Sequence, residues 1–262
     1  MAENLPQDDV RVVAITGGAT GIGLATALRL LAGGWRVGVF SERKDSVSDA
    51  YNRLRERGEP SRFHAAVVDI RDAWAVRSFF ADVAERLGSV SALVSNAAYV
   101  PPKGPQGRIM FADVTAAEWD QVLATNLTGA MISCQCVLPA MVKARHGRIV
   151  IIGSVAGRAR STVAGVSYMA SKAALVGVAR SIVGEYSQHG ITANTICPGR
   201  VVTGLTGPAD TPANIAAVGL IPAGRLGQPD EIARVAEFLI QQDAGFINGA
   251  IIDVNGGEFA PS

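Results

Sequence analysis

The sequence lacks an excess of either charge. Its 262 residues carry 24 Lys and Arg against 23 Asp and Glu, a formal net charge of +1. This balance gives no general attraction to nucleic acid or to an anionic membrane surface. No apolar run approaches the roughly 18 residues of a membrane-spanning helix. The start, MAENLPQDDV, is polar and acidic, unlike a signal or transit peptide. We therefore expect neither nucleic acid nor membrane as a partner.

Cysteine is also scarce. Cys134 and Cys136 flank one residue in an apolar helical stretch without a nearby histidine, which is poor spacing for a zinc site, and the third is Cys197. Free cysteines are usually small buried hydrophobes. We predict a cytoplasmic protein without disulfides and without a metal site.

No linker is apparent. No Gly/Pro/Ser-rich stretch, charge run, internal repeat or low-complexity segment divides the chain, and a hydrophobic content of 48% suffices for a sizeable core. We therefore predict a single domain over residues 1–262.

Short apolar runs alternate with amphipathic stretches. The apolar runs, each typical of a strand buried on both faces, are 10–16, 36–40, 63–68, 91–95, 147–153, 191–196 and 250–254. The helical patterns between them are 21–33, 45–58, 72–87, 115–143, 168–188 and 228–241. Repeated strand–helix units form right-handed crossovers. The pattern predicts an α/β fold, a Rossmann-like doubly wound sandwich with a seven-stranded parallel sheet.

A glycine-rich turn, TGGATGIGLATAL (16–28), directly follows the first strand and opens a helix. Glycine tolerates positive φ and lets the backbone approach a ligand closely. The helix N-terminus offers free N–H groups and a positive dipole end to a pyrophosphate. A glycine triplet alone indicates only a tight turn, but this position favours dinucleotide binding.

The spacing T-G-x-x-x-G-x-G resembles the nucleotide-binding motif of the short-chain dehydrogenase/reductase family. Further segments match that family in register: VVDIRD (67–72), SNAA (95–98), TNLTG (125–129), IGSVAG (152–157), Y-x-x-x-K (168–172) and CPGRVVT (197–203). SNAA departs from the usual N-N-A-G at its first and last positions but keeps Asn96 and Ala97. The resemblance covers most of the chain.

This resemblance implies an NAD(P)(H)-dependent oxidoreductase that interconverts a secondary alcohol and a ketone. The implied cofactor-binding residues are Gly17, Thr20, Gly21, Ile22, Gly23, Ser41, Glu42, Arg43, Asp69, Ile70, Asn96, Ala97, Tyr168, Lys172, Pro198, Gly199, Val201 and Thr203. Among them, Asp69 would bond the adenine amino group, and Val201 and Thr203 would hold the nicotinamide carboxamide.

Tyr168 and Lys172 are four residues apart in a segment that favours helix, so they share one face. A phenol with a pKa near 10 is a poor base at neutral pH. A neighbouring ammonium, together with the positive nicotinamide of the oxidised cofactor, would lower that pKa. We predict that Tyr168 is the general acid in reduction and the general base in oxidation.

The resemblance adds three roles. Lys172 would also bond the nicotinamide ribose, Ser154 would position the substrate oxygen, and Asn126 would hold a water in a proton relay to Lys172. Taken singly, a turn cap for Ser154 and a local backbone contact for Asn126 are the simpler interpretations. A non-catalytic nucleotide-binding scaffold is the alternative from another functional class, but such proteins usually lose the tyrosine or the lysine.

In the family that this sequence resembles, a residue at the end of the second strand binds the adenosine ribose of the cofactor. Ser41 occupies that position here. No carboxylate blocks a 2′-phosphate there. Glu42 would repel a phosphate, whereas Arg43 and Lys44 could reach it, and Thr20 stands where many NADP enzymes carry arginine. We favour NADP(H), with NAD(H) as the alternative.

The closest well-known subfamily by pattern is 3-oxoacyl-[acyl-carrier-protein] reductase. Lys143, Arg145, His146 and Arg148 could meet an acidic carrier protein. An ordinary solvated helix end, with cations near the negative dipole pole, is the preferred interpretation. The segment 98–119 looks longer than in these reductases, which favours a different substrate.

Several cations lie near the expected substrate mouth: Arg158, Arg160, Arg200, Lys103 and Arg108. One hypothesis is that they grip an anionic substrate through a guanidinium fork. The alternative, which we prefer, is that they pair with distant acids or point to solvent.

Two expectations concern larger structures. Helices 115–143 and 168–188 carry more apolar residues than one sheet face covers, and the resemblance places them in the subunit interface of a homotetramer. The segment of about 203–222, rich in Gly, Pro and Thr, is expected to form a lid that orders on ligand binding.

Overall fold

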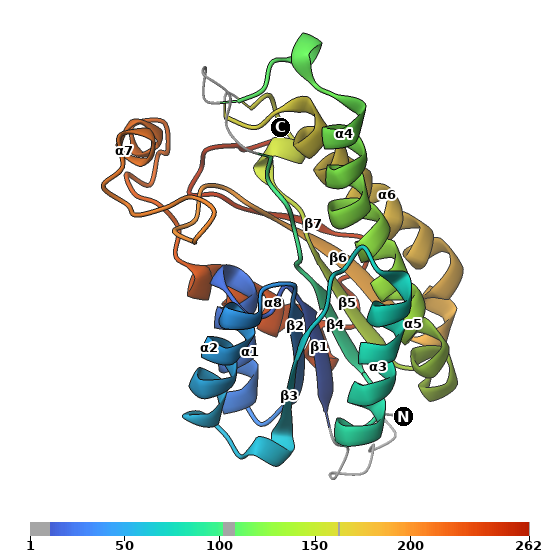
Figure 1. The fold of residues 1–262 in the computed structure, drawn as a ribbon. Coiled ribbons are helices and arrows are strands. Elements are labelled where there is room, and N and C mark those ends of the chain that lie inside the picture. Colours follow the sequence, from blue (N-terminus) through green and yellow to red (C-terminus); the bar gives the residue numbers. More distant parts are fainter. Residues whose placement is uncertain (1–10, 102–107, 162, 262) are drawn as a thin grey trace.

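A seven-stranded parallel sheet runs through the centre of the protein (Figure 1). The computed structural model describes residues 11–101, 108–161 and 163–261. The strands are β1 (Val12–Thr16), β2 (Arg36–Ser41), β3 (Phe63–Val67), β4 (Ala92–Ser95), β5 (Gly147–Ile152), β6 (Ile191–Pro198) and β7 (Ile251–Val254). Their order is β3-β2-β1-β4-β5-β6-β7, which confirms the predicted fold class. The order reverses between β1 and β4, where ligands of such sheets bind at the carboxyl ends.

Helices cover both faces of the sheet (Figure 1). One face carries α1 (Gly21–Ala32), α2 (Lys44–Arg55) and α8 (Pro229–Leu239). The other carries α3 (Ala73–Leu87), α5 (Gly129–Ala144) and α6 (Val166–Tyr186), with α4 (Ala116–Leu123) above α5. Alternate β1 residues enter two separate cores, Val12 and Ala14 on the α3–α5–α6 side and Val13 and Ile15 on the other. Burial on both faces explains why the strands are apolar throughout.

Shorter elements complete the described chain. These are α7 (Pro212–Val218), η1 (Pro60–Arg62), η2 (Phe111–Asp113), η4 (Val155–Gly157), η5 (Ser187–His189), η6 (Gln242–Ala244) and the π-helical turn η3 (Ala124–Thr128). The helix expected over 115–143 is therefore α4 and α5 joined through η3. The sequence pattern did not reveal this π turn.

Two helical segments, 116–144 and 166–189, are long and apolar enough to span a membrane by length and mean hydropathy. Both supply residues such as Val137 and Leu175 to the core cluster on one sheet face. They are core helices of the sandwich.

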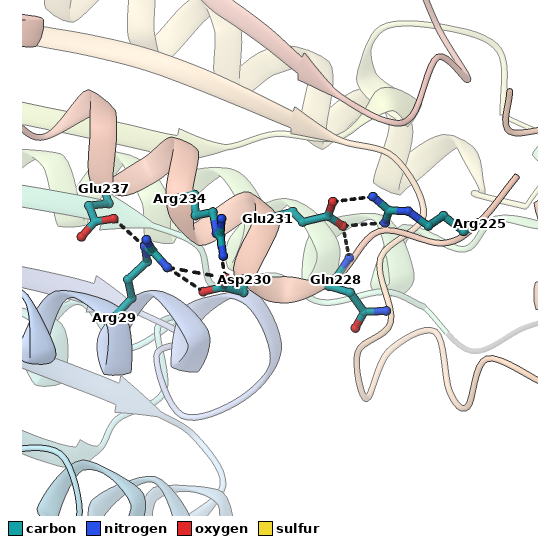
Figure 2. A network of polar contacts seen from close by, with 7 residues as sticks. All are labelled: Arg29, Arg225, Gln228, Asp230, Glu231, Arg234 and Glu237. Carbon is teal, nitrogen blue, oxygen red and sulfur yellow. Dashed lines mark hydrogen bonds and ion pairs between the residues drawn. The ribbon is translucent and has the colours of Figure 1, made fainter. Parts of the chain in front are cut away.

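An ion-pair network fastens α8 to α1 (Figure 2). Arg29 of α1 bonds Glu237 and, at 3.1 Å, Asp230 of α8, and Arg234 shares Asp230 at 2.9 Å. The two charged partners of the Arg29 guanidinium fix geometry better than an isolated surface pair. The network places the start of α8 under the segment 203–227, which leaves the sheet after β6 and carries α7.

Candidate functional site

The glycine turn is bonded directly to the end of β4. The Thr16 hydroxyl accepts the backbone N–H groups of Asn96 (2.9 Å) and Ala97 (3.0 Å). In return the Asn96 amide donates to the carbonyls of Thr16 (3.2 Å) and Gly17 (3.1 Å). The segment SNAA therefore braces the turn through its two retained residues, Asn96 and Ala97.

Glycine is required at two positions of this turn by lack of space. A Cβ on Gly17, which has φ +62°, would lie 2.8 Å from Ala97 Cα, and a Cβ on Gly23 would lie 2.4 Å from the Gly17 carbonyl oxygen. Gly21 also has positive φ and lies against Thr203, whose Cγ2 would be 3.2 Å from an added Cβ. The turn thus presents bare backbone to the region between β1 and β4.

The first turn of α1 fits a phosphate group. Its N-cap residue, Thr20, makes no side-chain cap hydrogen bond, and the turn contains no acidic residue. Thr20 is exposed, while Ile22 is half-buried and packs on the core. Free N–H groups and the positive dipole end of the helix favour an anion here. These residues fit the pyrophosphate of a dinucleotide.

Tyr168, Ser154 and Lys172 meet at the carboxyl edge of the sheet. Ser154 follows β5 and caps η4, its hydroxyl accepting the Ala156 N–H at 3.1 Å, while the same hydroxyl lies beside the phenol of Tyr168 and opposes the rise in that phenol's pKa. Tyr168 stands in the first turn of α6. One turn on, the buried Lys172 ammonium lies 5.7 Å from the Tyr168 ring centroid and donates to the Ile152 carbonyl at 2.8 Å.

Burial acts against the lowering of the tyrosine pKa that we expect from the ammonium and the oxidised cofactor. Burial raises the pKa of Tyr168 to about 12, and the Ser154 hydroxyl only partly opposes the rise. Burial also lowers the pKa of Lys172 to about 8. Desolvation disfavours the charged form of both groups. The protein alone therefore holds the phenol protonated.

Asn126 is buried in the π turn and its side chain bonds protein groups. Its amide oxygen accepts the Tyr99 N–H at 2.7 Å, and its amide nitrogen donates to the Tyr99 carbonyl (3.1 Å) and to Ser171 (3.0 Å). The Ser171 hydroxyl donates to the Tyr168 carbonyl at 2.8 Å. These partners are distant in the sequence, so the contacts differ from the local ones of the simpler interpretation. The side chain connects the loop after β4 to the turn that holds Tyr168.

The adenosine end of the site contains one residue that the motif analysis left without a role. Arg71 grips both carboxylate oxygens of Asp69, with a shortest contact of 2.6 Å, and lies 3.9 Å from Glu42. This pairing lowers the pKa of Asp69. The Asp69 carboxylate expected to bond adenine is therefore already engaged by Arg71. The sequence does place Arg71 two residues after Asp69, a spacing that could have indicated this pairing.

The other residues expected at this end lie where the motif indicated. Ser41 ends β2 and is half-buried, Glu42 is exposed, and Arg43 is exposed as the N-cap of α2. Ile70 is buried and its side chain packs against Gly129, where an added Cβ would lie 2.5 Å from Ile70 Cγ1.

The P-G turn follows β6 and lies against β7. Pro198 ends β6, and a Cβ on Gly199 would lie 2.8 Å from the Asn255 backbone. Val201 is buried, and Thr203 contacts the glycine turn through Gly21. The first and last motifs of the expected site thus meet in space.

Two of the mouth arginines have protein partners. Arg158 forms an ion pair with Asp253 at 3.0 Å and lies over the Phe259 ring at 5.3 Å. Arg200 donates to the Asn214 side chain at 2.6 Å, and its charge acts on the Glu258 carboxyl. For Arg158, pairing with a distant acid is confirmed, whereas the hydrogen-bond partner of Arg200 is a neutral amide. The fold brings acids from β7 and the tail to a stretch that has none of its own.

The remaining mouth cations are placed as follows. Arg160 is exposed, and Arg108 donates to the Ser161 carbonyl at 2.7 Å. Lys103 lies outside the described residues.

The basic cluster considered for carrier-protein docking lies at the opposite edge of the sheet. It precedes and begins β5, whereas Ser154 follows the end of that strand, roughly 20 Å away at 3.3 Å per residue. Arg148 is buried and donates to the carbonyls of Gly147, Gly190, Gln241 and Gln242. Arg145 donates to the Gln188 carbonyl at 2.9 Å. Arg145 and Arg148 therefore bond nearby carbonyls, in keeping with the ordinary helix end that we prefer.

Cys134 and Cys197 are buried free cysteines and Cys136 is half-buried, as expected of small hydrophobic residues. Burial raises the pKa of the Cys134 thiol to about 12.

Known proteins match this combination of fold and site. A sequence model of the family described as short chain dehydrogenase matches residues 11–214. The chain belongs to the short-chain dehydrogenase family. This short-chain dehydrogenase is 37% identical over 249 residues to the 3-oxoacyl-[acyl-carrier-protein] reductase MabA of Mycobacterium bovis, with 94% of this chain and 92% of the relative covered. It is 35% identical over 250 residues to an acetoacetyl-CoA reductase of Rhizobium meliloti, with 95% and 98% covered.

Solved structures agree. A 3-oxoacyl-[acyl-carrier protein] reductase from Brucella melitensis with bound NAD has a TM-score of 0.87 and 30% identity, with 99% of this chain and 98% of that chain covered. This short-chain dehydrogenase is accordingly an oxidoreductase that acts on alcohol and keto groups with NAD(P). The non-catalytic scaffold is not supported.

Lys172→Met should change how stability depends on pH. The unfolded chain keeps the lysine proton up to pH about 10.5, whereas the folded protein releases it near pH 8. Stability therefore rises with pH across this window in the wild type, and this contribution is absent in the variant. Across this window we expect the free energy of unfolding of the wild type to rise by on the order of a few kcal/mol relative to that of K172M, since one pKa unit corresponds to ~1.4 kcal/mol.

Urea unfolding at pH about 8, 9 and 10 measures this difference. The exposed Lys143 serves as control, because K143M should parallel the wild type. Parallel curves for the wild type and K172M would mean that Lys172 is not desolvated.

Proposed function

We propose that the protein reduces a ketone to a secondary alcohol, with Tyr168 as the proton donor. The observation that carries this proposal is the half-buried Tyr168 phenol beside the Ser154 hydroxyl, with the buried Lys172 ammonium 5.7 Å from its ring; burial raises the pKa of the phenol to about 12. At neutral pH such a phenol is protonated and can give its proton to a carbonyl oxygen that accepts a hydride at its carbon. Oxidation of the alcohol by the same group requires the phenolate.

Ser154 and Lys172 would support that proton transfer. The Ser154 hydroxyl, next to the phenol, would donate to the substrate oxygen and hold it for Tyr168. Lys172, whose pKa burial lowers to about 8, is mostly protonated at neutral pH and would help to return a proton to the phenolate. Asn126, in the π turn, would hold a water at the start of this relay. Its amide also fixes the Tyr99 backbone.

The bound dinucleotide would supply the hydride. We propose that the glycine turn and the first turn of α1 hold its pyrophosphate, as their bare backbone and uncapped N–H groups favour. Thr203, which lies against Gly21, and Val201 would hold the carboxamide of the nicotinamide. Asn96 and Ala97 would support both through their bonds to Thr16.

NADP(H) is the cofactor that we propose, with NAD(H) as the alternative. Ser41 carries no charge at the end of β2, and Arg43 stands exposed two residues later. Glu42 opposes a phosphate, but Arg71 lies 3.9 Å from its carboxylate and reduces that repulsion. The Brucella melitensis neighbour was solved with NAD, which keeps the alternative open to measurement.

A 3-oxoacyl thioester is the substrate class that the relatives favour. The two relatives are named as reductases of 3-oxoacyl-[acyl-carrier-protein] and of acetoacetyl-CoA. An anionic group on the substrate would have to meet cations other than Arg158 and Arg200, for which the exposed Arg160 is the candidate. We also propose that the chain works in the cytoplasm as one nucleotide-binding domain.

Tyr168→Phe should abolish turnover while leaving cofactor binding nearly unchanged, because only the transferable proton is removed. A general acid contributes about 10²–10⁴-fold, so kcat should fall by at least about 100-fold. The assay follows oxidation of NADPH and NADH with acetoacetyl-CoA, ethyl acetoacetate and acetoacetate. Tyr186→Phe, at the other end of α6, is the matched control. A variant that keeps more than about a tenth of wild-type kcat would refute the role of Tyr168.

Arg43→Ala should raise KM for NADPH at least about tenfold and change KM for NADH little, if Arg43 pairs with the 2′-phosphate. Arg53→Ala provides an exposed cation change elsewhere on α2 and should affect neither. Equal effects on both cofactors, or a wild-type preference for NADH, would instead indicate Glu42 as the ribose ligand.

We propose a homotetramer built on α4–α5 and α6. Only 44% and 33% of the most apolar stretches of 116–144 and 166–189 are buried within one chain, which leaves apolar surface to be covered. Light scattering at micromolar concentration should give about 109 kDa, four times the 27.2 kDa chain. A mass near 27 kDa would contradict the assembly.

A further inference from the structure

The segment after β6 has a polar centre. Asn214, in α7, is fully buried, whereas large apolar side chains of the same segment are exposed: Leu205 (62%), Ile215 (62%) and Leu220 (71%). Figure 1 shows α7 and its connections, in orange, beyond the carboxyl edge of the sheet. These apolar side chains face outward and do not form a core for the segment. Hydrogen bonds to Asn214 instead hold its start together.

The Asn214 side chain joins three parts of the chain. Its amide nitrogen donates to the carbonyls of Pro208 (2.6 Å) and Thr206 (3.1 Å). Its amide oxygen accepts from Arg200 Nε at 2.6 Å. Arg200 follows β6, so the bond holds the α7 helix to the end of a central strand. The Asn214 side chain thus uses both the donor and the acceptor atoms of its amide.

These bonds continue to the residues proposed to hold the cofactor. The Thr206 hydroxyl donates to the Val201 carbonyl at 2.7 Å and accepts the Thr203 N–H at 2.9 Å. Thr203 lies against Gly21 of the glycine turn. The route from Asn214 to the glycine turn therefore passes through Thr206 and Thr203 by direct contacts.

The far end of the segment is held separately. Val201 and Gly227 form a bridge, and the Gly227 carbonyl accepts the Val202 N–H at 3.0 Å. Arg225 grips Glu231 at 2.7 Å, and the same carboxylate accepts the Gln228 N–H at 2.8 Å at the start of α8 (Figure 2). Because these contacts do not involve Asn214, its replacement should loosen the turn 201–208 without releasing 225–231.

We propose that Asn214 is a positioning residue for the turn Val201–Thr206, anchored by Arg200, and that it sets the affinity for the nicotinamide half of the cofactor. The proposal rests on the cofactor role given above to Val201 and Thr203. Asn214 acts only through other residues. Its contribution should be the same for NADPH and NADH, which share the nicotinamide.

Asn214→Leu tests the proposal by removing the amide while keeping the branched shape of the side chain. We expect Kd for NADPH and for NADH, from fluorescence titration, to rise at least about fivefold (RT ln 5 is about 1 kcal/mol, the size of one lost hydrogen bond). With acetoacetyl-CoA as substrate, KM for the cofactor should rise while kcat at saturation changes less. Without cofactor, backbone hydrogen exchange should accelerate in 202–208 and stay unchanged in 228–239.

Asn194→Leu is the matched control. Asn194 is also a buried asparagine bonded to backbone, accepting the Ala250 N–H (2.9 Å) and donating to the Ile247 carbonyl (2.7 Å). It should accelerate exchange near 247–250 and leave that of 202–208 unchanged. Arg200→Met, tested alone and with N214L, gives a double-mutant cycle in cofactor Kd, where we expect non-additive effects. If N214L does not fold, R200M and Asn214→Ser carry the test.

Cofactor Kd within about twofold of wild type in N214L, with unchanged exchange in 202–208, would overturn the proposal. Equal loss of affinity in N194L and N214L would also overturn it, because general destabilisation would then suffice. A wild type that binds neither NADPH nor NADH would refute the proposed function instead, a result that the wild-type titration gives before any variant is made.

Discussion

The close approach between the glycine turn and the end of β4 is the constraint on which the site depends. Gly23 packs on the Gly17 carbonyl with no room for a Cβ, and the Thr16 hydroxyl accepts two N–H groups from the start of the next loop. This contact joins the two halves of the sheet where the strand order reverses. A ligand of such a sheet binds at that reversal. Any side chain at Gly17 or Gly23 would push the halves apart and move the site with them.

Desolvation is the second physical effect that shapes the site. Tyr168 and Lys172 shift in opposite directions for one reason, the cost of charge in a buried place. The phenol becomes a weaker acid and the amine a weaker base, so their pKa values, about 12 and about 8, lie further apart than those of the free side chains. Transfer of the phenol proton to the neutral amine is therefore less favourable here than between the free side chains. The surroundings of the pair, rather than attraction between its two members, therefore set its proton chemistry.

Charge at the substrate side is arranged by long-range pairing. Arg158 reaches Asp253 in β7 and Phe259 in the tail, while Arg200 connects to Asn214 in α7 and acts on Glu258. Each arginine thus holds a wall of the site in place. These pairs connect the loop after β5, the segment after β6 and the C-terminal tail, which otherwise share few elements of regular structure. The guanidinium groups of Arg158 and Arg200 thus contact protein groups that hold these segments together.

The sequence alone determined the strands, most helices and the residues of the site motifs, because apolar periodicity and glycine spacing are local properties. It located β1 through β7 to within two residues at each end, and it paired Tyr168 with Lys172 through helical spacing. Tertiary structure decided what depends on distant partners: the direction of the Tyr168 pKa shift, the capture of Asp69 by Arg71, and the pairing of Arg158 with Asp253. It also decided that the basic cluster at 143–148 faces the opposite edge, and that Asn214 is buried. Burial and ion pairing arise from residues brought together by the fold, and no local pattern encodes them.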